Sequence, residues 1–179
     1  MIISPGRRYI FVHIPKTGGT SLALALEDRA MRDDIMLGDT PKALNRRRRI
    51  QSVASAGRLW KHSTLSDIDG LVSIDEIKQA FAFTLVRNPW DRAVSYYHWL
   101  KEQSFDHPAV GLAKQMTFEG FVCHPDTQAA FRRSPAKSYM RRADGIVQCQ
   151  AFIRLEAFAE DARLLIHHLG FSIELPQVN

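Results

Sequence analysis

Three short runs of β-branched, aromatic and other apolar residues are each followed by a stretch with helical character, and this alternation limits the possible fold more than any other feature. The runs are "RRYIFVHI" (7–14), "AFAFTLV" (80–86) and "CQAFIRLE" (149–156). The stretches that follow them are "SLALALEDRAM" (21–31), "RNPWDRAVSYYHWLKE" (87–102) and "AFAEDARLLIHHLG" (157–170). Alternating strands and helices favour a parallel sheet with helices on both faces and ligands at the carboxyl ends of the strands. We therefore predict a three-layer α/β/α fold with a central, mainly parallel sheet.

Residues with strong positional preferences indicate where these elements end. Pro15 ends the first strand because it has no N–H to donate to a further ladder bond. Asn88 can cap the second helix, with Pro89 at its first position, and Gly170 ends the last helix. Three weaker signals are a capping box in "SIDE" (73–76) that starts a helix to about Gln79, a short basic helix in "PKALNRRRR" (41–49) and a short strand in "RLWKH" (58–62).

The composition suits one domain without a membrane span or a secretion signal. The chain has 179 residues, of which 45% are hydrophobic, and contains no apolar window of about 18 residues. Its two cysteines, Cys123 and Cys149, lack the paired spacing of a zinc or redox site, so we expect reduced packing residues in a cytoplasmic protein. The formal charge of +5 suits an anionic ligand, but it does not distinguish nucleic acid, nucleotide and acidic glycan.

The stretch "HIPKTGGTS" (13–21) joins the first strand to the first helix and has the composition of an anion-binding loop. A helix N-terminus directs unpaired N–H groups and the positive end of its dipole at one point. The two glycines allow the backbone to approach a phosphate, and the lysine adds a mobile positive charge. The residues concerned are Lys16, Thr17, Gly18, Gly19, Thr20 and Ser21. The alternative interpretation is a glycine-containing turn with a surface lysine.

The order of residues in this loop argues against a nucleotide kinase or triphosphatase, which remains the alternative enzyme. That class carries G-x-x-x-x-G-K-[ST], with the lysine after the glycines and a hydroxyl placed for Mg²⁺. Here Lys16 precedes the glycines, and the second strand ends in Arg87 instead of an Asp suited to a metal. We therefore expect a second anion, and no metal, at this position.

Arg87 and Ser95 form a second candidate anion site. Arg87 follows the second strand, and Ser95 lies about two turns into the next helix, so both could contact one phosphate. Two phosphate sites on neighbouring loops require a ligand with phosphates at two places. A nucleoside 3′,5′-bisphosphate meets this requirement better than ATP does.

With these two segments, "FVHIPKTGGTSL" and "FTLVRNPWDRAVSYYHWL", the chain resembles the carbohydrate sulfotransferases that use 3′-phosphoadenosine 5′-phosphosulfate. The segments "FIRLEAFAEDARLLIHHLG" and "LPQVN" are similar to later blocks of that family. The resemblance implies a P-loop-like fold and no required metal. It also implies that the loop from Lys16 to Ser21 binds the 5′-phosphosulfate, while Arg87 and Ser95 hold the 3′-phosphate.

The resemblance further implies that His62, in "WKHSTLSDI", is the catalytic base, and that Lys16 stabilises charge on the leaving oxygen. The alternative interpretation of His62 is a packing or surface histidine. We expect structural roles for the other candidates: His13 in the core of the first strand, His98 on the second helix, and His167 and His168 near a helix end.

The resemblance suggests an acceptor of glycan or glycolipid type, although family likeness alone does not identify the substrate. The basic run Arg46–Arg49 could contact an anionic saccharide or simply form a solvated face. Another class of function would be a polyanion or nucleic-acid binding module built on this run, but no nucleic-acid motif supports it. We predict a single sulfotransferase-like domain over residues 1–179. Because relatives continue beyond "LPQVN", one interpretation is that a C-terminal segment is lacking.

Overall fold

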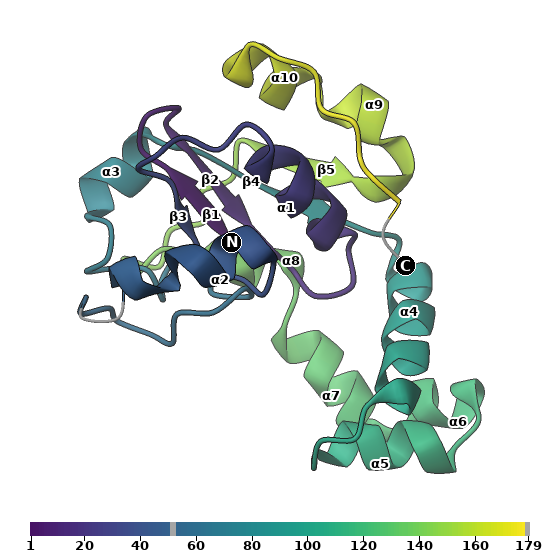
Figure 1. Ribbon diagram of the computed structural model, residues 1–179. Coiled ribbons are helices and arrows are strands. Elements are labelled where there is room, and N and C mark those ends of the chain that lie inside the picture. The colour runs from purple at the N-terminus through teal and green to yellow at the C-terminus, as the bar shows by residue number, and fades with distance from the viewer. Residues whose placement is uncertain (51–52, 178–179) are drawn as a thin grey trace. The chain divides into compact units, whose positions relative to one another are not determined.

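A computed structural model of the protein describes residues 1–50 and 53–177. A five-stranded mixed sheet forms the centre of the larger of its two units (Figure 1). The order of strands is β3-β1-β2-β4-β5. Strand β1 is antiparallel to both neighbours, whereas β2, β4 and β5 run parallel to one another. The strands are β1 (Ile2–Ser4), β2 (Tyr9–Val12), β3 (Ile35–Met36), β4 (Phe81–Val86) and β5 (Ala151–Arg154).

The three strands predicted from the apolar runs are confirmed as β2, β4 and β5. Phe11 of β2 lies opposite Phe83 of β4, which lies opposite Ala151 of β5. Because the three strands are parallel, their carboxyl ends meet at one edge of the sheet. The segments after Val12, Val86 and Arg154 therefore all start from that edge.

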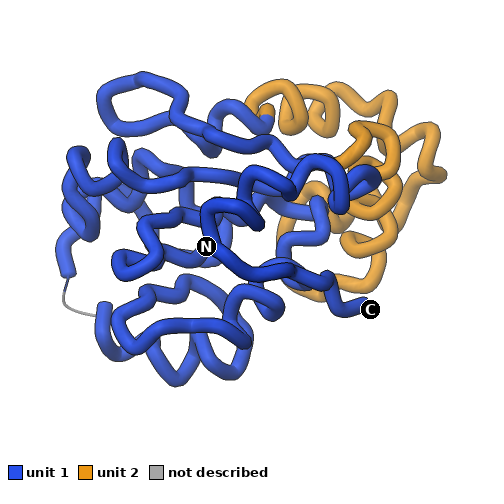
Figure 2. Tube along the Cα trace, turned by 90° about the horizontal axis from the view of Figure 1, so that it is seen from above, with its two compact units in different colours: residues 1–86, 136–179 blue, residues 87–135 orange. Residues whose placement is uncertain are grey.

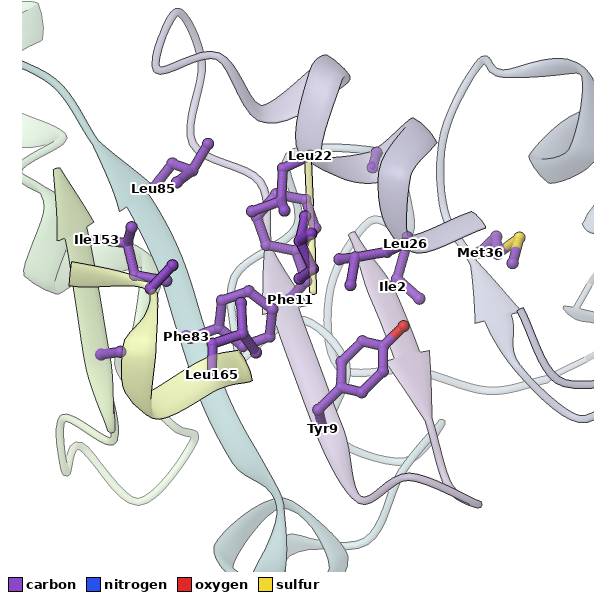
Figure 3. Close-up of a cluster of buried hydrophobic side chains, with 14 of the residues drawn as sticks. Ile2, Tyr9, Phe11, Leu22, Leu26, Met36, Phe83, Leu85, Ile153 and Leu165 are labelled. Atoms are coloured by element: carbon purple, nitrogen blue, oxygen red, sulfur yellow. The ribbon is translucent and has the colours of Figure 1, made fainter. Parts of the chain in front are cut away.

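Alternate residues of β1, β2, β3 and β4 enter two different hydrophobic clusters, so this part of the sheet is covered on both faces. In β5 only Ala151 and Ile153 are buried, and Phe152 and Arg154 are exposed. On one face Phe11 and Phe83 stack with ring centroids 5.4 Å apart and pack with Leu22, Leu26 and Leu165 (Figure 3). The opposite face packs Ile10, Val12 and Ala82 against the loop around Leu65 and Ile68. Burial of this kind contributes about 25 cal/mol per Å² of apolar surface and is the main source of stability.

The helices of this unit follow from the same two clusters. The first face packs α1 (Gly19–Glu27), α2 (Pro41–Arg46), α9 (Phe158–Asp161) and α10 (Arg163–Leu169); the second packs α3 (Ile74–Gln79) and α8 (Ala136–Tyr139). The capping box predicted at Ser73 is present, since its side chain accepts from Glu76 N–H while the Glu76 carboxylate accepts from Ser73 N–H. Two 3₁₀ turns, η1 (Arg47–Ile50) and η2 (Leu155–Ala157), complete the unit. The fold is therefore the predicted α/β arrangement.

Four details differ from the predictions or complete them. Strands β1 and β3 have three and two residues and carry too short a pattern to be recognised. The segment 58–62 forms turns instead of a strand, because its backbone bonds locally, as in the bond from Ser63 N–H to Trp60 O. The helix expected over 157–170 is divided into α9 and α10 at Ala162, whose ψ is −3°. Gly170 ends α10 with a φ of +74°, as predicted.

Residues 87–135 form a second compact unit made of helices (orange in Figure 2). Its elements are α4 (Pro89–Glu102), α5 (Pro108–Gln115), α6 (Phe118–Cys123) and α7 (Pro125–Arg133). Tyr97, Leu100, Val110 and Phe121 form its buried core. As predicted, Asn88 caps α4 by accepting from Trp90 N–H at 2.9 Å, with Pro89 at the first position.

Among the described helices, none is long and apolar enough to cross a membrane.

Candidate active site

The loop between β2 and α1 contains two residues with left-handed backbone. Lys16 has a φ of +63° and Gly18 a φ of +82°. This conformation suits glycine but costs an L-residue such as lysine about 1–2 kcal/mol. Thr17 is buried, and its hydroxyl donates to the Ile14 carbonyl at 2.9 Å, which closes the turn. The hydroxyl proton of Thr17 is thus used inside the loop.

The amino end of α1 has the features of a helix N-terminus that can bind an anion. Gly18 precedes the helix without a side-chain cap, and the first turn contains no acidic residue. The first main-chain bond of the helix runs from Leu22 N–H to Gly18 O, so the N–H groups of Gly19, Thr20 and Ser21 precede the regular ladder. Three N–H groups at the positive end of the helix dipole, beside a lysine, form a set of donors that fits a phosphate or sulfate oxygen.

Gly19 is required by a close contact with His13. A Cβ atom at residue 19 would lie 2.1 Å from Cδ2 and 2.4 Å from Nε2 of the His13 ring. His13 was expected within the strand; it follows directly after β2 and is buried as expected, with 7% of its surface exposed. The sequence suggested that Gly19 admits a phosphate. In the structure its missing side chain also makes room for the imidazole of His13, and the approach of a phosphate remains a prediction.

His62 is joined to this contact by a hydrogen bond. Its Nδ1 lies 2.8 Å from the carbonyl oxygen of His13, and the two imidazole rings meet edge to face with centroids 4.7 Å apart. A carbonyl oxygen only accepts, so Nδ1 carries the proton and Nε2 of the neutral ring has a lone pair. Trp60 contacts the same imidazole edge to face at 5.0 Å. The ring of His62 is therefore oriented, with its basic nitrogen at Nε2.

Both imidazoles are held in the neutral form. Burial lowers the pKa of His62 to about 4, and the bond to the His13 carbonyl opposes this only in part. Burial also lowers the pKa of His13 well below its usual value, with the nearby N-terminal amine and His62 adding to the effect. A neutral His62 can accept a proton at neutral pH.

Arg87 and Ser95 belong to the helical unit 87–135. Arg87 directly follows Val86, the last residue of β4, and Ser95 lies half-buried on α4. Strand β4 is the parallel neighbour of β2, so Val86 ends at the sheet edge where the Lys16 loop begins. Binding of a phosphate by Arg87 and Ser95 remains a prediction.

Other residues singled out in the sequence have mainly structural roles. Nε2 of His168 donates to the Arg7 carbonyl at 2.9 Å, and its ring stacks on Phe81. Cys149 is half-buried, and burial raises the pKa of its thiol to about 12. Cys123 is exposed, so the expectation that both cysteines are packing residues is wrong for this one. Within residues 1–50 and 53–177, no group of three or more His, Cys, Asp or Glu side chains is arranged to hold a metal ion.

Sequence reasoning missed the parts of this site that depend on tertiary contacts. His13 was assigned to the core alone, although its carbonyl orients His62. Trp60 and Lys61 were not singled out, although they precede His62 directly. Their adjacency to the candidate base was the one signal that could have drawn attention to them.

Comparison with known proteins identifies the family. A family model described as "Sulfotransferase family" matches residues 1–177. No curated protein and no solved structure matches the chain significantly.

Proposed function

The chain belongs to the sulfotransferase family, and we propose that it transfers a sulfuryl group from 3′-phosphoadenosine 5′-phosphosulfate to a hydroxyl group of a carbohydrate acceptor. Sulfuryl transfer is the general activity of this family. The choice of donor and acceptor is our proposal, as is a cytoplasmic location. The observation that carries it is the continuous set of contacts from Gly19 through His13 to His62, which joins an open helix N-terminus to an oriented neutral base.

The proposed reaction is a displacement at sulfur in which three residue groups divide the work. Nε2 of His62 accepts the proton of the acceptor hydroxyl while its oxygen forms a bond to sulfur. The bond from sulfur to the 5′-phosphate oxygen breaks, and its electron pair stays on that oxygen. Lys16 and the N–H groups of Gly19, Thr20 and Ser21 stabilise the charge that develops there. The products are the sulfate ester and adenosine 3′,5′-bisphosphate.

Positioning and charge stabilisation would supply most of the rate enhancement, as in phosphoryl transfer. The proposed role of Arg87 and Ser95 is to bind the 3′-phosphate, which distinguishes the donor from ATP. This division predicts that Lys16 acts mainly on turnover and Arg87 mainly on donor affinity.

The first experiment compares ligands by thermal shift and calorimetry. Adenosine 3′,5′-bisphosphate at about one hundred times its Kd should stabilise the protein by about 2.7 kcal/mol, whereas ATP with Mg²⁺ should have little effect. Transfer of labelled sulfate to a panel of acceptors then tests the reaction. Stabilisation by ATP with Mg²⁺ alone would support the nucleotide kinase or triphosphatase alternative and overturn the proposal.

A further inference from the structure

A pocket of about 230 Å³ lies beside the segment that carries His62. It lies within the sheet-containing unit and is lined by Met36, Leu37, Gly38, Asp39, Arg47, Ile50, Arg58, Leu59, Trp60 and Lys61. The sulfuryl-transfer chemistry described above uses none of these side chains. Apolar side chains form part of the wall, and the polar groups are mostly cationic.

The pocket has an excess of positive charge. Lys61 is engaged, since its Nζ lies 2.6 Å from Oδ2 of Asp39, the one acidic residue in the lining. Arg47 and Arg58 have no carboxylate partner within the described part of the chain. The guanidinium of Arg58 lies over the Trp60 ring, 5.2 Å from its centroid, which limits its freedom. Two guanidinium groups are therefore available to an anion.

The basic run that supplies Arg47 is not a uniform solvated face. Arg46 donates to the carbonyls of Met31 and Asp34, at 2.8 and 3.1 Å. Arg49 donates to the carbonyl of Arg32 at 2.6 Å. These two arginines hold the segment in place, whereas Arg47 lines the pocket and Arg48 does not.

The pocket lies beside residues that contact the candidate active site. Trp60 lines it and also contacts the imidazole of His62. A smaller cavity of about 10 Å³ shares part of its wall and extends to His13 and Thr20. The shared lining consists of Met36, Leu37, Gly38, Asp39 and Lys61. A ligand in the pocket would therefore contact Trp60, whose ring packs against the candidate base His62.

We propose that this pocket binds an acidic sugar residue of the acceptor, with its carboxylate or sulfate group paired to Arg47 and Arg58 and its ring packed against Trp60. This inference rests on the proposed function, because it concerns the acceptor of that reaction. Arginine pairs with carboxylate and sulfate through two parallel hydrogen bonds. The volume is below the roughly 300–1,000 Å³ of pockets for drug-sized ligands, which suits one sugar unit of a longer chain.

The test uses a chondroitin hexasaccharide, which carries uronate carboxylates, and its carboxyl-reduced, neutral form. Calorimetry on the full chain with adenosine 3′,5′-bisphosphate present should give at least tenfold tighter binding of the acidic form. Arg47→Gln and Arg58→Gln should each remove most of this preference and leave the Kd of the bisphosphate unchanged. Arg48→Gln is the matched control, because it removes the same charge from the same run outside the pocket, and it should leave the preference intact.

The outcomes separate this inference from the proposed function. If the bisphosphate binds but the protein does not distinguish the two hexasaccharides, the pocket is not an acidic-sugar site, whereas the donor assignment stands. Equal weakening by Arg48→Gln, or equal affinity for an oligonucleotide of the same charge, would show attraction by net charge and overturn the inference. If the bisphosphate does not bind, the proposed function fails first. Circular dichroism of each variant verifies folding.

Discussion

The carbonyl oxygen of His13 lies 2.8 Å from Nδ1 of His62, and this one contact determines which nitrogen of His62 can act as a base. The same His13 presses its ring against the backbone of Gly19, at the start of α1. A strand end, a helix start and a distant loop therefore meet in one cluster of the sheet-containing unit. The candidate base and the candidate anion-binding loop are therefore joined by direct packing contacts.

Replacement of His62 by Asn should lower turnover by about 10²–10⁴-fold, the usual contribution of a general base. The Asn amide can still donate toward His13 O, so the variant removes the base and preserves the donor. Because the pKa of His62 is lowered to about 4, the base is deprotonated at neutral pH and becomes protonated only as the pH falls through that value. The kcat/KM of the wild type should therefore stay constant from pH 7 down to about pH 5, as long as the protein remains folded.

Steady-state rates between pH 4.5 and 8 measure this prediction. An acid limb centred near 6.5, the ordinary value of a histidine, would show that burial does not control the base. Wild-type turnover in the His62→Asn variant would show that His62 is not the general base. His98→Asn, on an exposed residue of α4, is the control.

Replacement of Gly19 by Ala should destabilise the protein and reduce turnover together. The new Cβ would lie 2.1 Å from the His13 ring, so the imidazole must move, and overpacking of this kind costs about 1–3 kcal/mol. Gly111→Ala in α5 is the matched control, because a Cβ there meets no atom within 4 Å and alanine favours the helix. Urea unfolding of both variants measures their free energies of unfolding. Equal stability of the two would show that the close approach of His13 to Gly19 is not maintained in solution.

The sequence predicted the three parallel strands because they depend on local patterns, and the prediction of an anion-binding loop rests on a local pattern of the same kind. "RRYIFVHI" and "AFAFTLV" are apolar enough to be buried on both sides, and glycines beside a helix start are typical of loops that bind anions. The resemblance to a family, not periodicity, drew attention to His62. Its tautomer could not be predicted, because it depends on a carbonyl 49 residues away in the chain.

Other features were missed because their causes are tertiary. Strand β3, with two residues, exists only because β1 offers it an edge. The packing of His13 against Gly19 was not predicted, because nothing in the sequence brings the ring of His13 back over that glycine. The pocket around Arg47 and Arg58 combines a 3₁₀ turn with a loop, and no spacing along the chain predicts that arrangement.

Replacement of Arg87 by Ala should weaken adenosine 3′,5′-bisphosphate binding selectively. Loss of a charge-assisted hydrogen bond costs about 1.5–3 kcal/mol, or about 10- to 150-fold in Kd. Adenosine 5′-monophosphate lacks the 3′-phosphate, so its affinity should not change. Calorimetry with both nucleotides measures the difference, and Arg133→Ala on α7 is a control for net charge. Equal loss of affinity for both nucleotides would show that Arg87 does not bind the 3′-phosphate.

The two cysteines should differ in reactivity. Alkylation requires the thiolate, and burial raises the pKa of Cys149 to about 12, so this thiol stays protonated at neutral pH. Cys123 is exposed and accessible to reagent. Iodoacetamide at pH 7.5, followed by peptide mass spectrometry, should label Cys123 much faster than Cys149. Comparable rates would mean that the region around β5 opens readily.

Replacement of Lys16 should separate turnover from stability. Lys16→Met keeps the length of the side chain and removes its charge, so kcat should fall by about 10²–10³-fold, the effect of losing one group that stabilises a developing anion. The Kd of adenosine 3′,5′-bisphosphate should change only a few-fold, because in the proposed site the N–H groups of α1 would still bind the 5′-phosphate. Lys78→Met, on the exposed surface of α3, is the matched control and should retain wild-type rates.

Lys16→Gly extends this test to the strained backbone. The φ of +63° costs lysine about 1–2 kcal/mol, whereas glycine adopts it freely and loses only about 0.5–1 kcal/mol through greater freedom of the unfolded chain. This variant should therefore be as inactive as Lys16→Met and at least as stable as the wild type in urea. A clear loss of stability would mean that the lysine side chain holds the loop together. Retained turnover in both variants would instead show that Lys16 takes no part in the reaction. The strained backbone at this position would then have no catalytic role.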